Sequence, residues 1–136
     1  MHKDIKDEIT GRVAFPSKLS SKEVASRLRR YIRSARQENG LHLVITSVCA
    51  CKDEVVFEFC AEHIPKGFWC KRHFVPSRFS IVTVLDFSDS VAGFLQEKSK
   101  RVRQHFGSGY NLKIIGQTMK AGETQTLVCV LAEKSS

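Results

Sequence analysis

The sequence predicts an α+β fold in which two tandem strand-helix-strand-strand (βαββ) units form one mainly antiparallel sheet, with both helices on one face. Two observations predict it. Strand-like and helix-like segments follow one another in the same order in residues 8–63 and again in residues 79–134. Each unit contains one amphipathic segment, whose apolar stripe must be buried against a sheet. A chain of 136 residues has the size of one domain, so we expect a single domain over residues 1–136, with the units joined by a basic, aromatic loop at residues 64–78.

The first unit is predicted to contain a strand, a helix and a hairpin of two strands, at residues 8–15, 20–40, 41–51 and 54–63. Apolar and polar residues alternate in the first strand, as they do where one face of a strand is buried. In the helix, apolar side chains recur at helical spacing, for example at Val24, Leu28 and Ala35. Ser20 or Ser21 can cap its start, and Gly40 favours its end.

The second unit repeats this order at residues 79–87, 88–109, 110–119 and 124–134. Ser88 or Asp89 can cap its helix, and Gly107 can end it. Strands 79–87 and 124–134 are apolar at both alternating positions, which is more than a sheet with one exposed face needs. We therefore expect these two strands to be central, or the second face of the sheet to be covered by a second subunit.

The charge balance favours a polyanionic partner. Lysine and arginine number 22 against 14 acidic residues, which gives a formal net charge of +8 and a pI near 9.5. The hydrophobic content of 42% is ordinary for a folded protein. A small domain with this excess of positive charge is typical of proteins that meet nucleic acid or an anionic surface. The alternative is a basic protein whose charge serves solubility alone.

Neither secretion nor a membrane segment is indicated. The first ten residues are charged and lack the apolar core of a signal peptide, and no apolar run approaches the roughly 18 residues of a membrane-spanning helix. The five cysteines are an odd number and lie mostly in strand-like stretches, which suits reduced thiols. We expect an intracellular protein, cytoplasmic or nuclear, that is not secreted and has no membrane partner.

Catalytic motifs are missing from the sequence. It contains no phosphate-binding glycine motif, no nucleophile elbow and no H-E-x-x-H zinc-protease motif. Cysteine and histidine occur together, but an activated thiolate needs a spatial partner that spacing does not reveal. The sequence therefore predicts a protein that is not an enzyme.

Two Cys-x-x-His pairs lie close together and suggest a zinc site. Cys60, His63, Cys70 and His73 are ligand types that tetrahedral zinc prefers. If residues 54–63 form a strand, however, Cys60 and His63 point to opposite faces, and both could bind one metal only if the strand ended near Ala61. Cys49 and Cys51 of the preceding strand could substitute for one of the pairs. The alternative is a buried Cys60, a strand-end His63 and an exposed loop. Zinc is the one cofactor that the sequence suggests, and the fold does not require it.

Basic residues of both helices and the connecting loop are the candidate nucleic-acid-binding residues. They are Lys22, Arg29, Arg30, Arg33 and Arg36 in the first helix, Lys66, Trp69, Lys71, Arg72 and Arg78 in the loop, and Arg101 and Arg103 in the second helix. In the first helix Lys22, Arg29, Arg33 and Arg36 lie within about 60° of one another at 100° per residue, roughly opposite the apolar stripe, and Arg30 flanks them. In the loop, aromatic rings alternate with cations, as in surfaces that stack on bases and hold phosphates. The alternatives are a solvated helix face and a small aromatic core under the loop.

These features together predict a non-catalytic nucleic-acid-binding protein that prefers RNA or single strands to duplex DNA. The predicted mechanism is neutralisation of the phosphate backbone by the basic helix faces, with aromatic stacking from the loop. Two other classes stay open. One is a protein-interaction or assembly module, a homodimer formed through the second sheet face or an edge strand. The other is a small-ligand sensor with its site between the two units.

Overall fold

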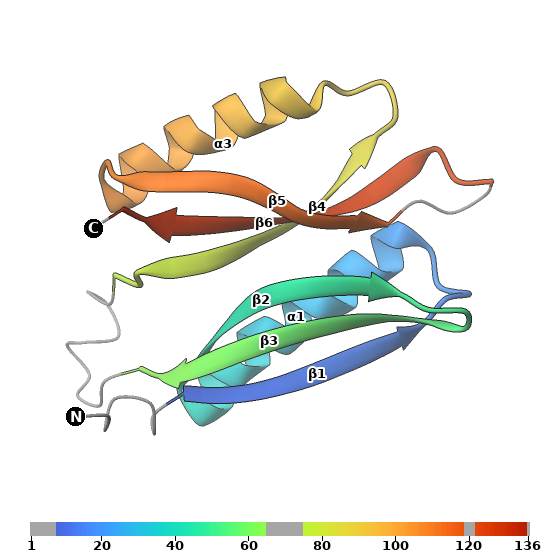
Figure 1. Cartoon of the computed structure of the whole chain (residues 1–136), viewed down its shortest axis with the longest axis horizontal. Coiled ribbons are helices and arrows are strands. Elements are labelled where there is room, and N and C mark those ends of the chain that lie inside the picture. Colours follow the sequence, from blue (N-terminus) through green and yellow to red (C-terminus); the bar gives the residue numbers. More distant parts are fainter. Residues whose placement is uncertain (1–7, 65–74, 119–121, 136) are drawn as a thin grey trace.

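The structure is a computed structural model, and it describes residues 8–64, 75–118 and 122–135. In chain order the elements are β1 (Glu8–Pro16), α1 (Ser21–Asn39), β2 (Leu41–Ala50), β3 (Glu54–His63), β4 (Arg78–Asp86), α3 (Val91–Phe106), β5 (Tyr110–Thr118) and β6 (Gln125–Lys134). The strands form two antiparallel three-stranded sheets, β1-β3-β2 and β4-β6-β5, which we call the first and the second sheet (Figure 1). The predicted α+β class is confirmed.

Helix ends follow local sequence signals. The side chain of Ser20 accepts a hydrogen bond from the backbone N–H of Glu23 at 3.1 Å and caps α1. Gly40 ends α1 with a φ of 63°, a conformation that strains any residue with a Cβ atom. In the second half the cap is Ser90, whose side chain accepts from the N–H of Gly93 at 3.0 Å. The predicted caps of this helix, Ser88 and Asp89, lie too early in the chain.

Helix α1 packs between the two sheets. Its buried residues join one cluster with residues of β2, β3, β4 and β6. Alternate residues of β6 face different neighbours: Leu127 and Cys129 belong to the cluster around α1, whereas Val128 and Val130 pack with Phe94 and other residues on the α3 side. Since side chains alternate along a strand, α1 and α3 lie against opposite faces of the second sheet.

The prediction of one sheet with both helices on one face is therefore not confirmed. The six strands divide into two sheets, and the apolar character on both faces of β6 comes from a helix on each side within the same chain. β6 is the central strand of its sheet, as expected, but β4 is an edge strand. Among the described residues, no helix is long and apolar enough to cross a membrane.

Side chains close the gap between the two sheets. β2 and β4 are edge strands that approach each other, yet their contacts run through side chains. The backbone N–H of Ile45 donates to the hydroxyl oxygen of Ser80 at 2.7 Å, and the ring Nε2 of His42 lies 2.8 Å from the carbonyl oxygen of Arg78. The guanidinium of Arg29 donates to the carbonyl oxygen of Val82 at 2.9 Å. Because these groups occupy the facing edges, no backbone ladder joins the sheets.

Candidate functional site

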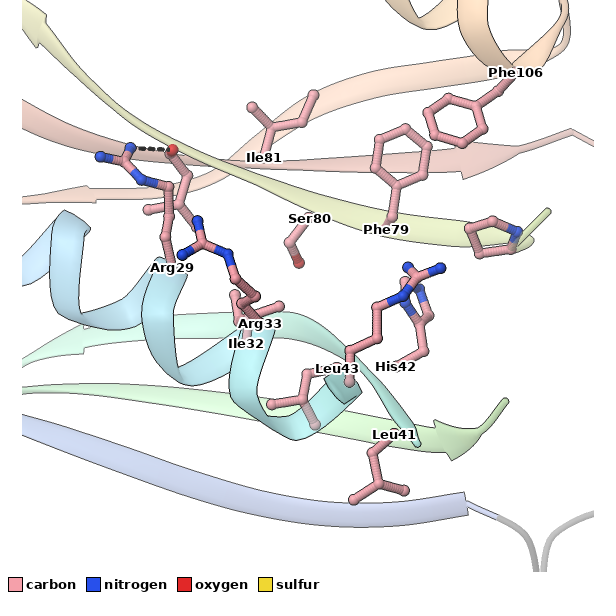
Figure 2. Close-up of a pocket in the computed structure, with 13 residues that line it drawn as sticks. Arg29, Ile32, Arg33, Leu41, His42, Leu43, Phe79, Ser80, Ile81 and Phe106 are labelled. Carbon is pink, nitrogen blue, oxygen red and sulfur yellow. Dashed lines mark hydrogen bonds between the residues drawn. The ribbon is translucent and has the colours of Figure 1, made fainter. Parts of the chain in front are cut away.

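A groove of about 630 Å³ runs along β4 and is bounded by α1, β2 and the end of α3 (Figure 2). We call it the β4 groove. Its lining residues are Arg29, Ile32, Arg33, Arg36, Leu41, His42, Leu43, Pro76, Phe79, Ser80, Ile81, Val82 and Phe106. Alternate residues of β4 line different parts of it: Phe79 and Ile81 point toward α3, and Ser80 points toward α1 (Figure 2). Both halves of the chain therefore contribute to this groove.

Three arginines of α1 form one side of the groove. Arg29, Arg33 and Arg36 are four and three residues apart, so they share one helix face over about two turns. Arg29 is held by its hydrogen bond to the carbonyl oxygen of Val82. Within the described part of the chain, Arg33 and Arg36 have no ion-pair or hydrogen-bond partner, and no acidic residue lines the groove. The groove therefore offers uncompensated positive charge to a ligand.

Aromatic rings form the opposite end of the groove. The ring of Phe79 lies 4.9 Å from that of Phe106 and 5.3 Å from that of Tyr110, measured between centroids. Phe106 is 39% exposed, so one part of its ring is available to a ligand while the other packs. The hydroxyl of Tyr110 donates to the carbonyl oxygen of Pro76, and burial raises the pKa of this phenol. The hydrogen bond to Pro76 holds the Tyr110 side chain in place, and its ring packs edge-on against Phe79.

The arginine row borders the buried stripe of α1 and does not lie opposite to it. Ile32, a half-buried residue of that stripe, lines the groove together with Arg29 and Arg33 (Figure 2). The second sheet packs against this flank of α1 and turns it into a groove wall. Lys22 and Arg30 are exposed on the same helix and do not line the groove.

The basic residues of α3 are separate from this row. Arg101 and Arg103 are exposed on a helix that lies across the second sheet from α1. The guanidinium of Arg101 lies 3.5 Å from the carboxylate of Glu97, and both side chains are more than 60% exposed. The two helices therefore do not present one continuous basic surface.

Of the predicted binding residues in the loop, the structure describes only Arg78. Lys66, Trp69, Lys71 and Arg72 lie outside the described residues, so their predicted role stays a prediction. Arg78 is the first residue of β4, and its guanidinium donates to the sulfur of Cys60 at 2.9 Å. Its side chain therefore packs on the face of the first sheet that is turned away from α1. There it lines a second pocket with Thr10, Arg12 and Glu58.

The predicted zinc ligands are only partly described. Cys60 is buried and His63 is exposed, and because they are three residues apart on β3 they point to opposite faces. Cys70 and His73 lie outside the described residues. Across the described ranges no group of three or more potential metal-binding side chains comes together. A zinc site thus stays a prediction that depends on residues 65–74.

The remaining described thiols differ in chemistry. Burial raises the pKa of Cys129 to about 12, so this thiol is a core group that stays protonated at neutral pH. Cys49 and Cys51 are exposed, with their sulfur atoms 3.8 Å apart. The hydrogen bond between the two thiols is the main cause that raises the pKa of Cys51. Neither environment is that of an activated catalytic thiolate.

Comparisons with known proteins add no family. No protein-family model matches the chain, and neither a curated protein nor a solved structure matches it. The β4 groove is therefore the observation from which a function can be inferred.

Sequence patterns did not reveal the aromatic part of the groove. Phe79 begins the predicted strand 79–87 and Phe106 lies in the predicted helix 88–109, and 27 positions separate them in the chain. Phe79 follows Arg36 by 43 positions, and Phe106 follows it by 70. The one usable signal was the exposed end of an apolar stripe at Phe106, next to the helix-ending Gly107.

Proposed function

We propose that the chain is a non-catalytic nucleic-acid-binding protein that prefers RNA or single strands to duplex. The arginine row of α1 neutralises the phosphate backbone, and the aromatic end of the β4 groove stacks on bases. The observation that carries this proposal is the pair Arg33 and Arg36, which have no partner among the described residues and line the same groove as the partly exposed ring of Phe106. Guanidinium groups of this kind suit phosphate oxygens, which they bind through two hydrogen bonds at once.

Packing of α1 favours single strands over duplex. A helix that reads duplex DNA enters the major groove with a face free of the protein core. α1 instead has sheets on two sides and buries Ser21, Val24, Ala25 and Leu28. Its exposed face runs beside the groove and carries Arg33 and Arg36, and a flexible single strand can follow both surfaces at once. Lys22 and Arg30 extend the positive field along the same helix.

A salt titration with a matched control tests the proposal. The double variant Arg33→Glu/Arg36→Glu removes two phosphate contacts, and Arg101→Glu/Arg103→Glu makes the same charge change on α3. For about four to six neutralised phosphates, the log–log slope of affinity against salt for a single-stranded RNA is roughly −3 to −4. Loss of two contacts on α1 should flatten this slope by about 1.4 and lower the affinity by about tenfold or more at low salt.

The control variant should keep the slope and lose at most about threefold, because its charges contribute only to the long-range field. Circular dichroism melts of both variants establish that the fold is kept. Equal losses of affinity in the two variants would mean that binding depends only on the net charge of the protein. Unchanged binding by the α1 variant would refute the interface.

A second candidate function is a sensor of a small anionic ligand. The volume of about 630 Å³ lies within the range of small-molecule sites, and the groove lies between the two halves of the chain. The discriminating measurement is competition by a free nucleoside monophosphate against a labelled oligonucleotide. Displacement of the oligonucleotide by an equal molar concentration of the nucleotide would favour the sensor. If displacement needs a large excess of the nucleotide, strand binding is favoured.

A further inference from the structure

The backbone of Ser80, a residue that lines the β4 groove, has a donor–acceptor pair without a hydrogen-bond partner among the described residues. In an antiparallel edge strand, every second residue directs its N–H and C=O away from the paired strand. The carbonyl oxygens of Arg78 and Val82 point outward, since His42 and Arg29 bind them. By the two-residue period Ser80, midway between them, directs its own N–H and C=O the same way. No hydrogen bond from this pair to another element is present among the described residues.

The size of this opening decides what can occupy it. An added β-strand would need a run of free backbone groups along the edge, and Arg29 and His42 already occupy the carbonyls on both sides of Ser80. One adjacent N–H and C=O pair instead matches the edge of a single planar ring that carries one acceptor and one donor. Nucleobases have such edges, and single-stranded nucleic acid exposes them.

The surroundings of Ser80 suit a base as well as a phosphate. Toward α3 lie Phe79, Ile81 and the partly exposed ring of Phe106, and toward α1 lie Arg33 and its neighbours in the row (Figure 2). A phosphate alone has no use for the apolar side of this groove. A nucleotide joins a flat ring to an anion through a sugar. Its base can pack on the aromatic side of the groove while its phosphate meets the arginines of α1.

We propose that the β4 groove holds one unpaired base of the bound strand, hydrogen-bonded to the backbone of Ser80 and stacked against Phe106, with the adjoining phosphates on Arg33 and Arg36. This inference rests on the proposed function and specifies it: the site binds a nucleotide unit and does not merely attract a polyanion. Backbone groups supply the contact to the base, so the site favours bases that place a donor beside an acceptor, as uracil does with its N3–H and carbonyl oxygens.

The test compares two strands of equal charge. One is a labelled ten-residue oligouridylate, and the other is a ribose-phosphate chain of the same length without bases. Fluorescence anisotropy at one salt concentration should show the oligouridylate binding about five- to a hundredfold more tightly, because stacking of even one base is lost in the other chain. Phe106→Ala should remove most of this difference while leaving the affinity for the base-free chain unchanged.

Val91→Ala is the matched control. Val91 is also 39% exposed on α3, but it lies at the other end of the helix and outside the groove. It should bind both strands as the unchanged protein does. If Phe106→Ala lowers the melting temperature strongly, Phe106→Leu serves instead, since it keeps an apolar side chain against Phe79 and removes the ring.

The outcomes separate this inference from the proposed function. Equal affinity for the two strands would overturn the base site and leave backbone binding intact. Failure of both strands to bind would overturn both proposals. A preference for the base-bearing strand that survives Phe106→Ala and Phe106→Leu would place the base elsewhere and so overturn the assignment to the β4 groove.

Discussion

Helices α1 and α3 carry similar positive charge but have different surroundings. α1 buries four residues between two sheets, whereas in α3 only Val102 is buried among the described residues. Arg29, Arg33 and Arg36 of α1 line a groove that has no acidic residue among its described lining residues, whereas Arg101 of α3 is paired with Glu97 in solvent. Exposed pairs of this kind contribute little. Clustered charge becomes a candidate site where packing fixes its helix and apolar surface adjoins it, and α1 alone meets both conditions.

The largest expected difference between the helices concerns stability. Leu28 is fully buried between the sheets, and Leu95 on α3 is only half-buried. Leu28→Ala should lower the free energy of unfolding by about 3–5 kcal/mol, because it leaves a cavity that neither sheet can fill. Leu95→Ala should cost about 1–2 kcal/mol, since less apolar surface is lost and solvent can refill the space. Urea denaturation measures both, and equal costs would contradict the central position of α1.

The second largest expected difference concerns the hydrogen bonds at the N-terminal ends of the two helices. The N–H and hydroxyl of Ser21 both donate to the carboxylate of Glu123, which reaches α1 from the segment before β6, with the hydroxyl contact at 2.7 Å. Ser21 is 2% exposed, so Glu123→Ala should leave a buried hydroxyl without its acceptor and cost about 1–3 kcal/mol. Ser90→Ala, at the exposed start of α3, should cost about 1 kcal/mol. Thermal melts at neutral pH compare them, with Glu123→Gln, which keeps one acceptor oxygen, expected in between.

A thiol on the α1 side of the second sheet makes stability depend on pH. Burial raises the pKa of Cys129 from 9.0 to about 12. The folded chain therefore keeps a proton that the unfolded chain loses above pH 9, and stability falls as pH rises from 9 toward 12. The expected loss is about 1.4 kcal/mol per pH unit. Denaturation at pH 8 and pH 10.5 should show a shallower fall for Cys129→Ala than for the unchanged protein; equal slopes would mean that this thiol is more solvated than the structure indicates.

Local features of the fold were predictable from the sequence, and its long-range arrangement was not. The strand alternation, the stripe of α1 and the cap at Ser20 were correct because each depends on residues within a few positions. The division into two sheets depends on side chains such as Ser80 and His42 that cap facing strand edges, and no local pattern encodes those partners. The candidate site was also only partly predictable. The arginine row was visible as a helical pattern, but the aromatic residues of the groove come from a strand and a helix that are distant in the sequence.

The smallest expected effect separates two neighbouring arginines of the same row. Arg29 donates to the carbonyl oxygen of Val82 and thereby closes part of the β4 edge, whereas Arg33 has no such partner among the described residues. Arg29→Ala should therefore lower the free energy of unfolding by about 1 kcal/mol, because a partly buried carbonyl loses its donor. Arg33→Ala should leave stability within about 0.5 kcal/mol of the unchanged protein.

Binding should reverse this order. Arg33→Ala removes a cation that is available to phosphate and should weaken single-strand binding. Arg29→Ala should weaken it less, because one N–H group of Arg29 already donates to the backbone of β4. Urea denaturation and anisotropy titrations on the same two variants measure both quantities. If Arg29→Ala were the weaker binder and the more stable variant, its side chain would point to the ligand, and the assignment of structural and binding roles along α1 would have to be exchanged.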